Sequence, residues 1–374
     1  MKNFIESNKE NILRTLRELC EIPAPSHFER ERALYCLRFL KEAGAEGAYI
    51  DEADNVVFPV NCEGGNITVI NAHLDTVFPD TEPMPYIDDG EYIRSPGVGD
   101  DTASVVILMY AIKYCIENGK FGGGAFLFVL NSCEEGLGNL KGIRRIFRDF
   151  EGRISRLVAL DSTFKSVVDR SVGSERYEVT LVTEGGHSYN AFGNRNAIAE
   201  LSRLVTEIYS ITVPKIGNSK TTYNVGGISG GTSVNTIAES ATMLCEYRSD
   251  NKECLSALRE KFREIFDGAR ARGLDLTVNM IGERPCMGDV DKKEQDKLTS
   301  VLSEVVHSVV GKLPYTRPGS TDCNIPHSLG IPAVSVGVFE GEGSHTRNEW
   351  IYRSSVFSGV EVSINIISEI SEEY

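Results

Sequence analysis

Apolar residues recur every three or four positions in the first part of the chain, a spacing typical of amphipathic helices. Two segments, from Ser7 to Glu10 and from Ser26 to Glu29, have the residue types and spacing of capping boxes. We therefore expect one helix to begin at each of them. The second helix should end at Gly44, since glycine commonly follows the last turn of a helix.

Short continuous apolar runs follow at 67–72, 124–131 and 156–160. Runs of this length are typical of strands that are buried on both faces of a mostly parallel sheet. Between the first two runs, residues 102–118 have apolar positions at helical spacing, and Gly119 follows them. Strands that alternate with helices in this way predict an α/β fold with a doubly wound, mostly parallel sheet.

The pattern changes in the middle of the chain, where apolar and polar residues alternate along the expected strands. We expect an order of strand, helix, strand, strand, helix, strand, at 174–184, 196–209, 221–228, 240–249, 250–267 and 274–283. This is the order of the ferredoxin-like motif. Asp250 is the expected cap of the second helix. We predict an inserted α+β domain over 173–285.

The α/β pattern resumes after the insert, with a helix expected near 292–310, a strand at 332–338 and a last helix from about Ser354. The α/β domain would then be discontinuous and consist of residues 1–172 and 286–374. A chain of 374 residues also exceeds the usual size of a single core, which favours two domains.

The net charge of −15 argues against partners such as nucleic acid or an anionic membrane surface. No stretch has the ~18 apolar residues of a membrane span, and the first residues lack the apolar core of a signal peptide. The nine cysteines lack paired spacings, and Cys20, Cys36, Cys115 and Cys254 fall on apolar faces of expected helices. These features predict buried free thiols and a cytoplasmic protein.

Candidate metal ligands lie near the expected strand ends. His73, Glu135 and Asp161 follow buried runs, Asp100 precedes a helix, and His345 lies far along the chain in a segment that would otherwise read as a surface loop. Groups beyond the carboxyl ends of strands meet at one edge of an open α/β sheet. Carboxylates with imidazoles suit Zn²⁺, Mn²⁺ or Co²⁺ rather than Ca²⁺. The set predicts a two-metal site and a metal-dependent hydrolase.

Three aspartates near these ligands have competing interpretations. Asp75 could accept the second N–H of a metal-bound His73, although a His-x-Asp pair alone would be a plain hydrogen bond at a strand end. Two metal ions ~3.5–4 Å apart need a bridging ligand. Asp100 can bridge, and its neighbour Asp101 is the alternative. A helix N-cap is the competing interpretation for both, and it fits Asp101 better.

Glu134 and Glu135 are adjacent acids after a buried run. One can bind metal while the other acts as a general base toward a water whose pKa a zinc ion lowers to ~7. Adjacent acids are more often a solvated turn, but that interpretation leaves the other candidate ligands unexplained.

Taken together, these motifs resemble the co-catalytic zinc exopeptidases, the family of peptidase T, carboxypeptidase G, acetylornithine deacetylase and succinyl-diaminopimelate desuccinylase. The resemblance covers nearly the whole chain. It implies two divalent metal ions per chain, with zinc expected and cobalt or manganese as alternatives. It implies a general base at Glu134, an orienting acid at Asp75, and two ligand sets that share one aspartate: His73, Asp100 and Asp161, and Asp100, Glu135 and His345.

The insert resembles the family's lid and dimerisation domain. His187, in a Gly-Gly-His-Ser segment, takes the position of the histidine that reaches the partner subunit's site and helps to hold the oxyanion, which implies a homodimer. Asn235, Arg248 and Gly319 lie in segments similar to those that bind substrate. An arginine fork suits a carboxylate, although a salt bridge on an exposed strand face is the alternative for Arg248.

The chain departs from the family at Cys133, where an aspartate is common, and at Thr102, where a lysine is common. Neither removes a ligand. An aspartate at Asp161 tends to accompany aminopeptidases and di- or tripeptidases, so the branch of peptidase T is favoured. The alternatives are a deacylase of N-acyl amino acids and an inactive dimeric scaffold, which should have lost a ligand or the base.

Overall fold

The computed structural model describes residues 1–373. The chain folds into two compact units. One consists of Met1–Ser171 with the chain from Gly288 onward, and the other of Val172–Met287. Each unit has a hydrophobic core of its own. The insert predicted from the sequence covered 173–285.

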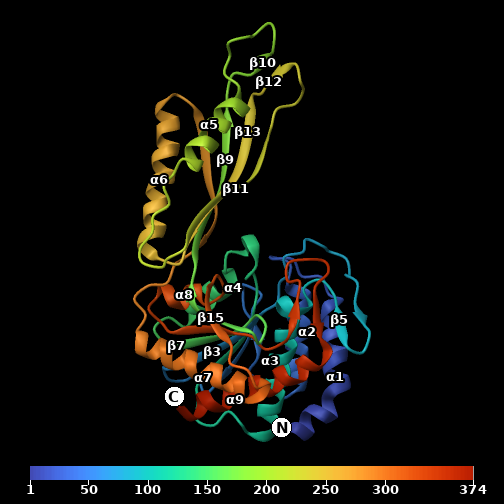
Figure 1. The fold of residues 1–374 in the computed structure, drawn as a ribbon. Coiled ribbons are helices and arrows are strands. Elements are labelled where there is room, and N and C mark those ends of the chain that lie inside the picture. The colour runs from blue at the N-terminus through green and yellow to red at the C-terminus, as the bar shows by residue number, and fades with distance from the viewer. Residues whose placement is uncertain (374) are drawn as a thin grey trace. The chain divides into compact units, whose positions relative to one another are not determined.

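The first unit is built on an eight-stranded mixed sheet (Figure 1). In spatial order its strands are β1 (Tyr49–Ile50), β2 (Val56–Val60), β6 (Phe126–Asn131), β3 (Ile67–His73), β7 (Ile154–Leu160), β16 (Ala333–Val336), β8 (Ser166–Ser171) and β15 (Tyr315–Gly319). The central pairs β6–β3, β3–β7 and β7–β16 are parallel, as is β8–β15, and the remaining pairs are antiparallel. The predicted α/β fold with a mostly parallel sheet is confirmed.

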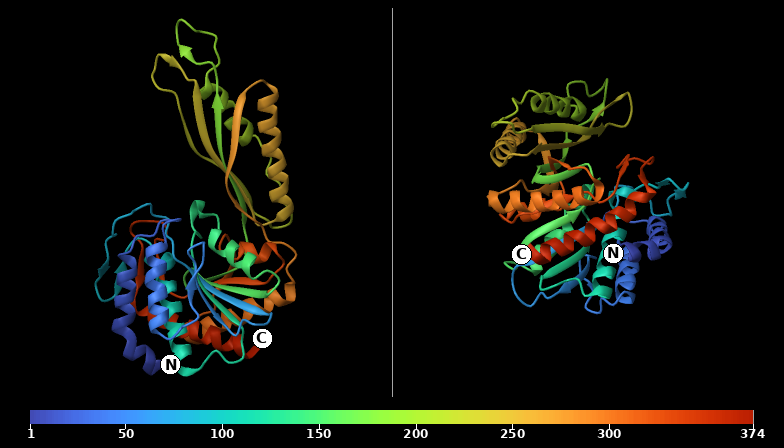
Figure 2. Two further views of the ribbon diagram at one scale, coloured as in Figure 1. Left: turned by 180° about the vertical axis from the view of Figure 1, so that it is seen from behind. Right: turned by 60° about the horizontal axis from the view of Figure 1, so that its bottom comes forward.

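Helices cover both faces of this sheet (Figure 2). One core includes residues of α1 (Lys2–Cys20), α2 (Arg30–Glu42), α3 (Ser104–Asn118), α7 (Lys292–Val310) and α9 (Arg353–Glu373). The core on the other face includes residues of α4 (Lys141–Asp149) and α8 (Asn324–Ser328). Successive side chains of β3 point into different cores, since Ile70 belongs to the first core and Val69 to the second. Burial on both faces explains why this strand is a continuous apolar run.

A smaller antiparallel sheet lies at one edge of the same unit and was not predicted. Its strands are β17 (Gly341–Glu342), β18 (Trp350–Tyr352), β5 (Tyr92–Arg94) and β4 (Ile87–Asp88). The pairing of β18 with β5 brings the segment after residue 340 beside the segment before residue 98. An irregular turn, Val98–Ala103, whose backbone is non-helical at Asp100 and Asp101, then leads into α3, and a 3-10 turn, Gly136–Gly138, follows β6.

The second unit is a four-stranded antiparallel sheet with two helices. The strand order is β11 (Thr221–Gly230), β13 (Ser240–Ser249), β9 (Gly173–Val182) and β14 (Asp275–Arg284), and the helices are α5 (Ala197–Tyr209) and α6 (Lys252–Ala271). Its chain order of strand, helix, strand, strand, helix, strand is the predicted one. A two-stranded ribbon of β10 (Gly186–His187) and β12 (Thr236–Ile237) extends this unit.

Both predicted capping boxes are wrong. The first helix begins at Lys2, so Ser7 lies inside it and its hydroxyl donates to the main-chain oxygen of Phe4. The second helix begins at Arg30 without a side-chain cap, and the hydroxyl of Ser26 donates elsewhere. Local spacing identified the helices but not their first residues, because other partners take these hydroxyl groups.

The predicted cap of α6 is off by one residue. Asn251, rather than Asp250, caps the helix, and its side-chain oxygen accepts the N–H of Cys254 at 2.9 Å. The predicted thiols are confirmed, because all nine cysteines are free and eight of them are buried. Across residues 1–373 no helix combines the length and apolarity needed to cross a membrane.

Candidate metal centre and active site

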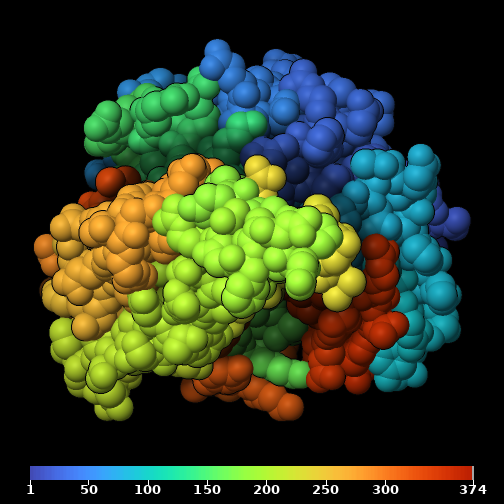
Figure 3. Space-filling view, turned by 90° about the horizontal axis from the view of Figure 1, so that it is seen from above, coloured from blue at the N-terminus to red at the C-terminus, as the bar shows by residue number. Residues whose placement is uncertain are grey.

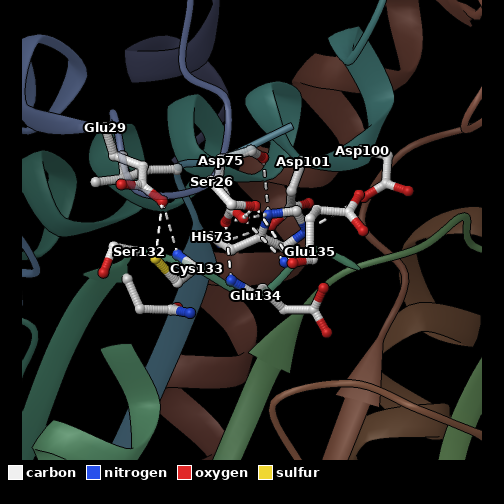
Figure 4. A network of polar contacts seen from close by, with 12 residues as sticks. Ser26, Glu29, His73, Asp75, Asp100, Asp101, Ser132, Cys133, Glu134 and Glu135 are labelled. Carbon is white, nitrogen blue, oxygen red and sulfur yellow. Dashed lines mark hydrogen bonds and ion pairs between the residues drawn. The ribbon is translucent and has the colours of Figure 1, made fainter. Parts of the chain in front are cut away.

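His73 is the last residue of β3, and its imidazole is buried. Nε2 lies 3.1 Å from Asp100 Oδ1. Nδ1 lies 3.0 Å from the main-chain oxygen of Asp75 and 3.4 Å from its carboxylate Oδ1. The two ring nitrogens therefore face different partners, and Nε2 is the one that faces the candidate bridging ligand (Figure 4). The closer partner of Nδ1 is main chain, which the sequence does not indicate.

The Asp75 carboxylate holds the turn after β6. Its Oδ1 accepts the N–H of Glu134 and its Oδ2 accepts the N–H of Glu135, both at 2.9 Å. The hydroxyl of Ser26 donates to Oδ2 at 2.6 Å (Figure 4). Burial opposes ionisation of Asp75, but its hydrogen bonds with His73 and Ser26 hold its pKa below the usual range. One buried carboxylate thus fixes His73 and the glutamate pair together.

Asp100 lies in the turn between β5 and α3 and contacts two histidines. Its Oδ1 faces His73, and its Oδ2 lies 3.1 Å from Nε2 of His345. His345 comes from the turn between β17 and β18, and its Nε2 also lies 3.2 Å from Glu135 Oε1. A carboxylate with one oxygen toward each histidine has the geometry that a bridging ligand needs.

The structure brings all five predicted ligands together. Asp161 directly follows β7 and joins them there. The side chains form three groups, and within each group the potential ligand atoms lie within 4.8 Å of one another. The groups are His73, Asp100 and Asp161; Asp100, Glu135 and His345; and His73, Glu134 and Glu135. The first two groups share Asp100. The third places the predicted base, Glu134, beside them.

The charges of this cluster fit bound cations. Burial and the neighbouring Asp100 carboxylate raise the pKa of Glu135 to about 8 and that of Asp161 to about 7. Hydrogen bonds with Asp100 and Glu135 raise the pKa of His345 to about 11. Carboxylates that lie this close together resist ionisation because their negative charges repel one another. A bound divalent cation would neutralise that charge. The donor types, their spacing and this excess of negative charge fit two divalent metal ions.

The interpretation of Asp101 as a helix cap is wrong. Its Oδ2 accepts the main-chain N–H of His73 at 3.0 Å. The N-cap position of α3 is occupied by Ala103, and no side chain caps this helix. Burial raises the pKa of Asp101 well above its usual value. The carboxylate therefore fastens the end of β3 rather than the start of the helix.

His187 and Asn235 belong to the second unit. His187 lies in the ribbon of β10 and β12, is exposed, and accepts the N–H of Tyr189 at Nδ1 over 3.3 Å. Asn235 lies in the loop before β12, where its side-chain oxygen accepts a hydrogen bond from Ser233. The loop atoms around residue 190, yellow-green in Figure 3, lie at the surface, and Tyr189 is 85% exposed.

Arg248 also lies in the second unit, and Gly319 lies in the first. The guanidinium of Arg248 donates to both carboxylate oxygens of Glu246, at 2.8 and 2.9 Å. This is the salt bridge that the sequence left as an alternative for Arg248. Gly319 ends β15, and a Cβ there would come within 2.9 Å of a methyl group of Val168. Close packing accounts for a glycine at this position.

Several residues around the site were missed from the sequence. Asp322 is buried, and its Oδ2 accepts the amide groups of Asn71 and Asn131, at 2.7 and 2.8 Å. Burial and the charge of Glu134 raise the pKa of Asp322 to about 8. Glu349 accepts main-chain N–H groups from the turn that carries Asp100. The sequence offers one signal for these two acids, which is their closeness to a residue already singled out. Asp322 lies close to Gly319, and Glu349 lies close to His345.

Known proteins resemble this chain over most of its length. Its structure is similar to aminopeptidase PepT from Bacillus cereus, with a TM-score of 0.73, 23% identity, and coverage of 97% of this chain and 99% of that chain. It is also similar to a tripeptidase from Staphylococcus aureus, with a TM-score of 0.77, 20% identity, and coverage of 98% and 99%. Carboxypeptidase G2 of a Pseudomonas species is 22% identical over 326 residues, which cover 85% of this chain and 77% of that protein.

The model of one protein family matches most of the sequence. Residues 69–369 match peptidase family M20/M25/M40, and this range contains all five predicted metal ligands. The resemblance inferred from the motifs is thereby confirmed. The chain belongs to peptidase family M20/M25/M40 and is a metallopeptidase, a hydrolase.

Proposed function

We propose that this protein is a two-metal exopeptidase that removes the N-terminal residue from short peptides, as an aminopeptidase of the di- or tripeptidase type. The observation that carries the proposal is the pair of ligand groups joined through Asp100, with Glu134 beside them. The proposed sets are His73, Asp100 and Asp161 for one ion, and Asp100, Glu135 and His345 for the other. When bound, two such ions would polarise the scissile carbonyl and lower the pKa of an attacking water.

We assign the role of general base to Glu134. It is buried, it lies beside the ligands, and Asp75 fixes its main chain. A carboxylate in this position can accept the proton of the attacking water and deliver it to the leaving amine. Asp75 is then a positioning residue, because one carboxylate orients His73 and the turn that carries both glutamates.

We further propose that His187 completes the active site of a partner subunit in a homodimer. Its Nδ1 accepts main-chain N–H groups of Tyr189 and Asn190. In a neutral imidazole one nitrogen accepts and the other carries the proton, so these bonds favour hydrogen on Nε2. An exposed Nε2–H is a suitable donor to the oxyanion that forms when a peptide carbonyl is attacked.

The preference for peptides rests on two observations. Asp161 is an aspartate, which the family resemblance associates with aminopeptidases and tripeptidases, and the chain is similar in fold to an aminopeptidase and a tripeptidase. A deacylase of N-acyl amino acids remains the second candidate, because similarity to a carboxypeptidase favours recognition of a free carboxylate. We assign recognition of this carboxylate to Asn235, Arg248 and Gly319. Arg248 donates to Glu246, so a substrate carboxylate would have to displace Glu246 from it.

We propose zinc as the native metal, with cobalt or manganese as alternatives, and the cytoplasm as the site of action. The mixed carboxylate and imidazole donors support the choice of metal. Nine free cysteines support a reducing compartment.

A hydrolysis screen separates the two candidates. Di- and tripeptides, with free and with blocked N-termini, would be compared with N-acetyl and N-succinyl amino acids in the presence of Zn²⁺, Mn²⁺ or Co²⁺. An aminopeptidase should cleave free peptides and lose activity when the N-terminus is acetylated. Faster cleavage of the N-acyl amino acids would favour the deacylase.

A further inference from the structure

Glu349 makes contacts that the roles of ligand and base do not explain. It lies in the same segment as His345, just before β18, and is 1% exposed. Its Oε2 accepts the N–H of Gly97 at 2.7 Å. Its Oε1 accepts the N–H groups of Gly99 and Asp100 at 2.9 and 2.8 Å. Three main-chain donors thus converge on one buried carboxylate, an arrangement that stabilises negative charge without a cationic side chain.

The turn that carries Asp100 is shaped around this carboxylate. The backbone is non-helical at Asp100 and Asp101, and α3 begins only at Ser104, so the buried N–H groups of this turn need an acceptor other than the helix. Gly97 has a φ of 73°, which favours glycine. A Cβ at Gly99 would lie 2.9 Å from Glu349 Oε1 and 2.7 Å from a ring carbon of Phe339. Glycine at 99 therefore permits the close approach of the carboxylate.

The same contacts connect two candidate ligands. Asp100 directs one carboxylate oxygen toward His73 and the other toward His345. Its orientation depends on the main chain of residues 97–100, which Glu349 holds. Since His345 precedes Glu349 in one short segment, a shift of that segment would move His345 and the turn of Asp100 together.

We propose that Glu349 is a positioning residue for the bridging ligand: through the N–H groups of 97, 99 and 100 it keeps Asp100 and His345 in the geometry that lets one carboxylate serve both metal ions. This inference rests on the proposed two-metal function. Replacement of a residue that orients a metal ligand by hydrogen bonding, without contacting the metal, typically lowers metal affinity by about 10- to 100-fold.

The test compares Glu349→Gln with a matched control, Glu175→Gln. Glutamine keeps the size of the side chain but replaces one acceptor oxygen with an NH₂ group that cannot accept from an N–H donor. Glu175 is also a fully buried carboxylate, hydrogen-bonded to Tyr177 and Arg259, but it belongs to the second unit. The control therefore reports the loss of a buried carboxylate that does not contact the turn of Asp100.

Two quantities are measured on the full-length chain. The first is Zn²⁺ affinity and stoichiometry, from titration of the metal-free protein against a chromophoric chelator. The second is hydrogen–deuterium exchange of residues 97–100 in the metal-free protein. Glu349→Gln should weaken the binding of at least one Zn²⁺ by about 10- to 100-fold and speed exchange at 97–100, and Glu175→Gln should change neither.

Wild-type affinity and wild-type exchange in Glu349→Gln would overturn the proposal, as would an equal loss of affinity in both variants. If Glu349→Gln does not fold, Gly99→Ala disturbs the same contact from the other side and is judged by the same two quantities. If the wild-type protein binds none of Zn²⁺, Mn²⁺ and Co²⁺, the two-metal function fails, and exchange at 97–100 alone decides whether Glu349 holds the turn.

Discussion

At the scale of single residues, two adjacent glutamates have different surroundings. The main-chain N–H groups of Glu134 and Glu135 both donate to Asp75, so the two residues are fixed by one carboxylate. Glu135 Oε1 lies 3.2 Å from His345 Nε2, and Glu135 groups with Asp100 and His345. Among the described residues, Glu134 groups with His73 and Glu135. This difference supports a ligand role for Glu135 and a base role for Glu134.

Replacement of each glutamate should therefore affect a different quantity. Glu134→Ala should retain two metal ions per chain while kcat falls by at least ~10²-fold, the scale of general-base catalysis. Glu135→Ala should lose metal, because it removes a ligand. Metal analysis by mass spectrometry and steady-state kinetics measure the two effects. Loss of metal from the first variant with none lost from the second would reverse the assignment.

By itself His345 reads as a surface-loop residue, but the other four ligands could be predicted from the sequence because each is a metal-binding residue type near a strand end or a helix start. The residues that hold them could not. Ser26 is 49 positions from its partner Asp75, and Glu349 is 250 positions from Gly99. Such pairs meet only through the fold, and serine or glutamate in a loop has no distinguishing periodicity. Asp101 was misread for the same reason, since its partner, the N–H of His73, is distant in sequence.

At the scale of elements, apolar periodicity located the strands β3, β6, β7 and β16 of the large sheet, the long helices of the first unit, and the four long strands and two helices of the insert. It did not locate the strands β1, β2, β8 and β15 or the helices α4 and α8. Three further features also escaped it. The short strands of the small sheet are too brief to show a period. The irregular turn at Val98–Ala103 has no sequence signal of its own. The first residues of α1 and α2 were misplaced, because a capping box was inferred from serines whose hydroxyl groups bond elsewhere.

One buried histidine connects elements of the first unit. His327, in α8, lies 2.7 Å from the hydroxyl of Ser171 at the end of β8, and its Nε2 lies 2.8 Å from the main-chain oxygen of Ala333 at the start of β16. Burial lowers the pKa of His327 to about 4. The side chain is therefore neutral in the folded protein at pH 5, whereas an exposed histidine of the unfolded chain is mostly protonated there.

This difference predicts a pH dependence of stability with a definite sign. Between pH 6.5 and 4 the unfolded state binds the proton and the folded state does not, so the free energy of unfolding should fall as the pH is lowered. A shift of this size corresponds to about 3 kcal/mol across the window. Urea unfolding of metal-free protein should show a shallower decline for His327→Gln than for wild type. Parallel declines in the two proteins would contradict the prediction.

At the scale of the whole molecule, the change from α/β to α+β patterning indicated an insert with its own core. The sequence could not indicate how His187 meets a substrate, because that depends on a second chain. We expect His187→Ala to lower kcat by about 10²–10³-fold, the typical effect of losing one oxyanion donor. Metal content and the unfolding midpoint should stay unchanged.

Mixing variants tests whether His187 acts in a partner subunit. A heterodimer of His187→Ala and Glu134→Ala would contain one site with both residues intact. After verified subunit exchange, an equimolar mixture should recover about a quarter of wild-type activity, since half of the dimers are mixed and each has one intact site. A mixture that stays as inactive as either parent would show that His187 does not act across the dimer.

The central claim is that two metal ions held by the ligands around Asp100 carry out hydrolysis. The most direct measurement is peptide hydrolysis during metal removal and return, with metal content determined on the same samples. A chelator should abolish cleavage of the best substrate from the screen, and added Zn²⁺, Mn²⁺ or Co²⁺ should restore it as two ions bind per chain. Full activity in a demonstrably metal-free sample would show that hydrolysis does not depend on metal ions at this site.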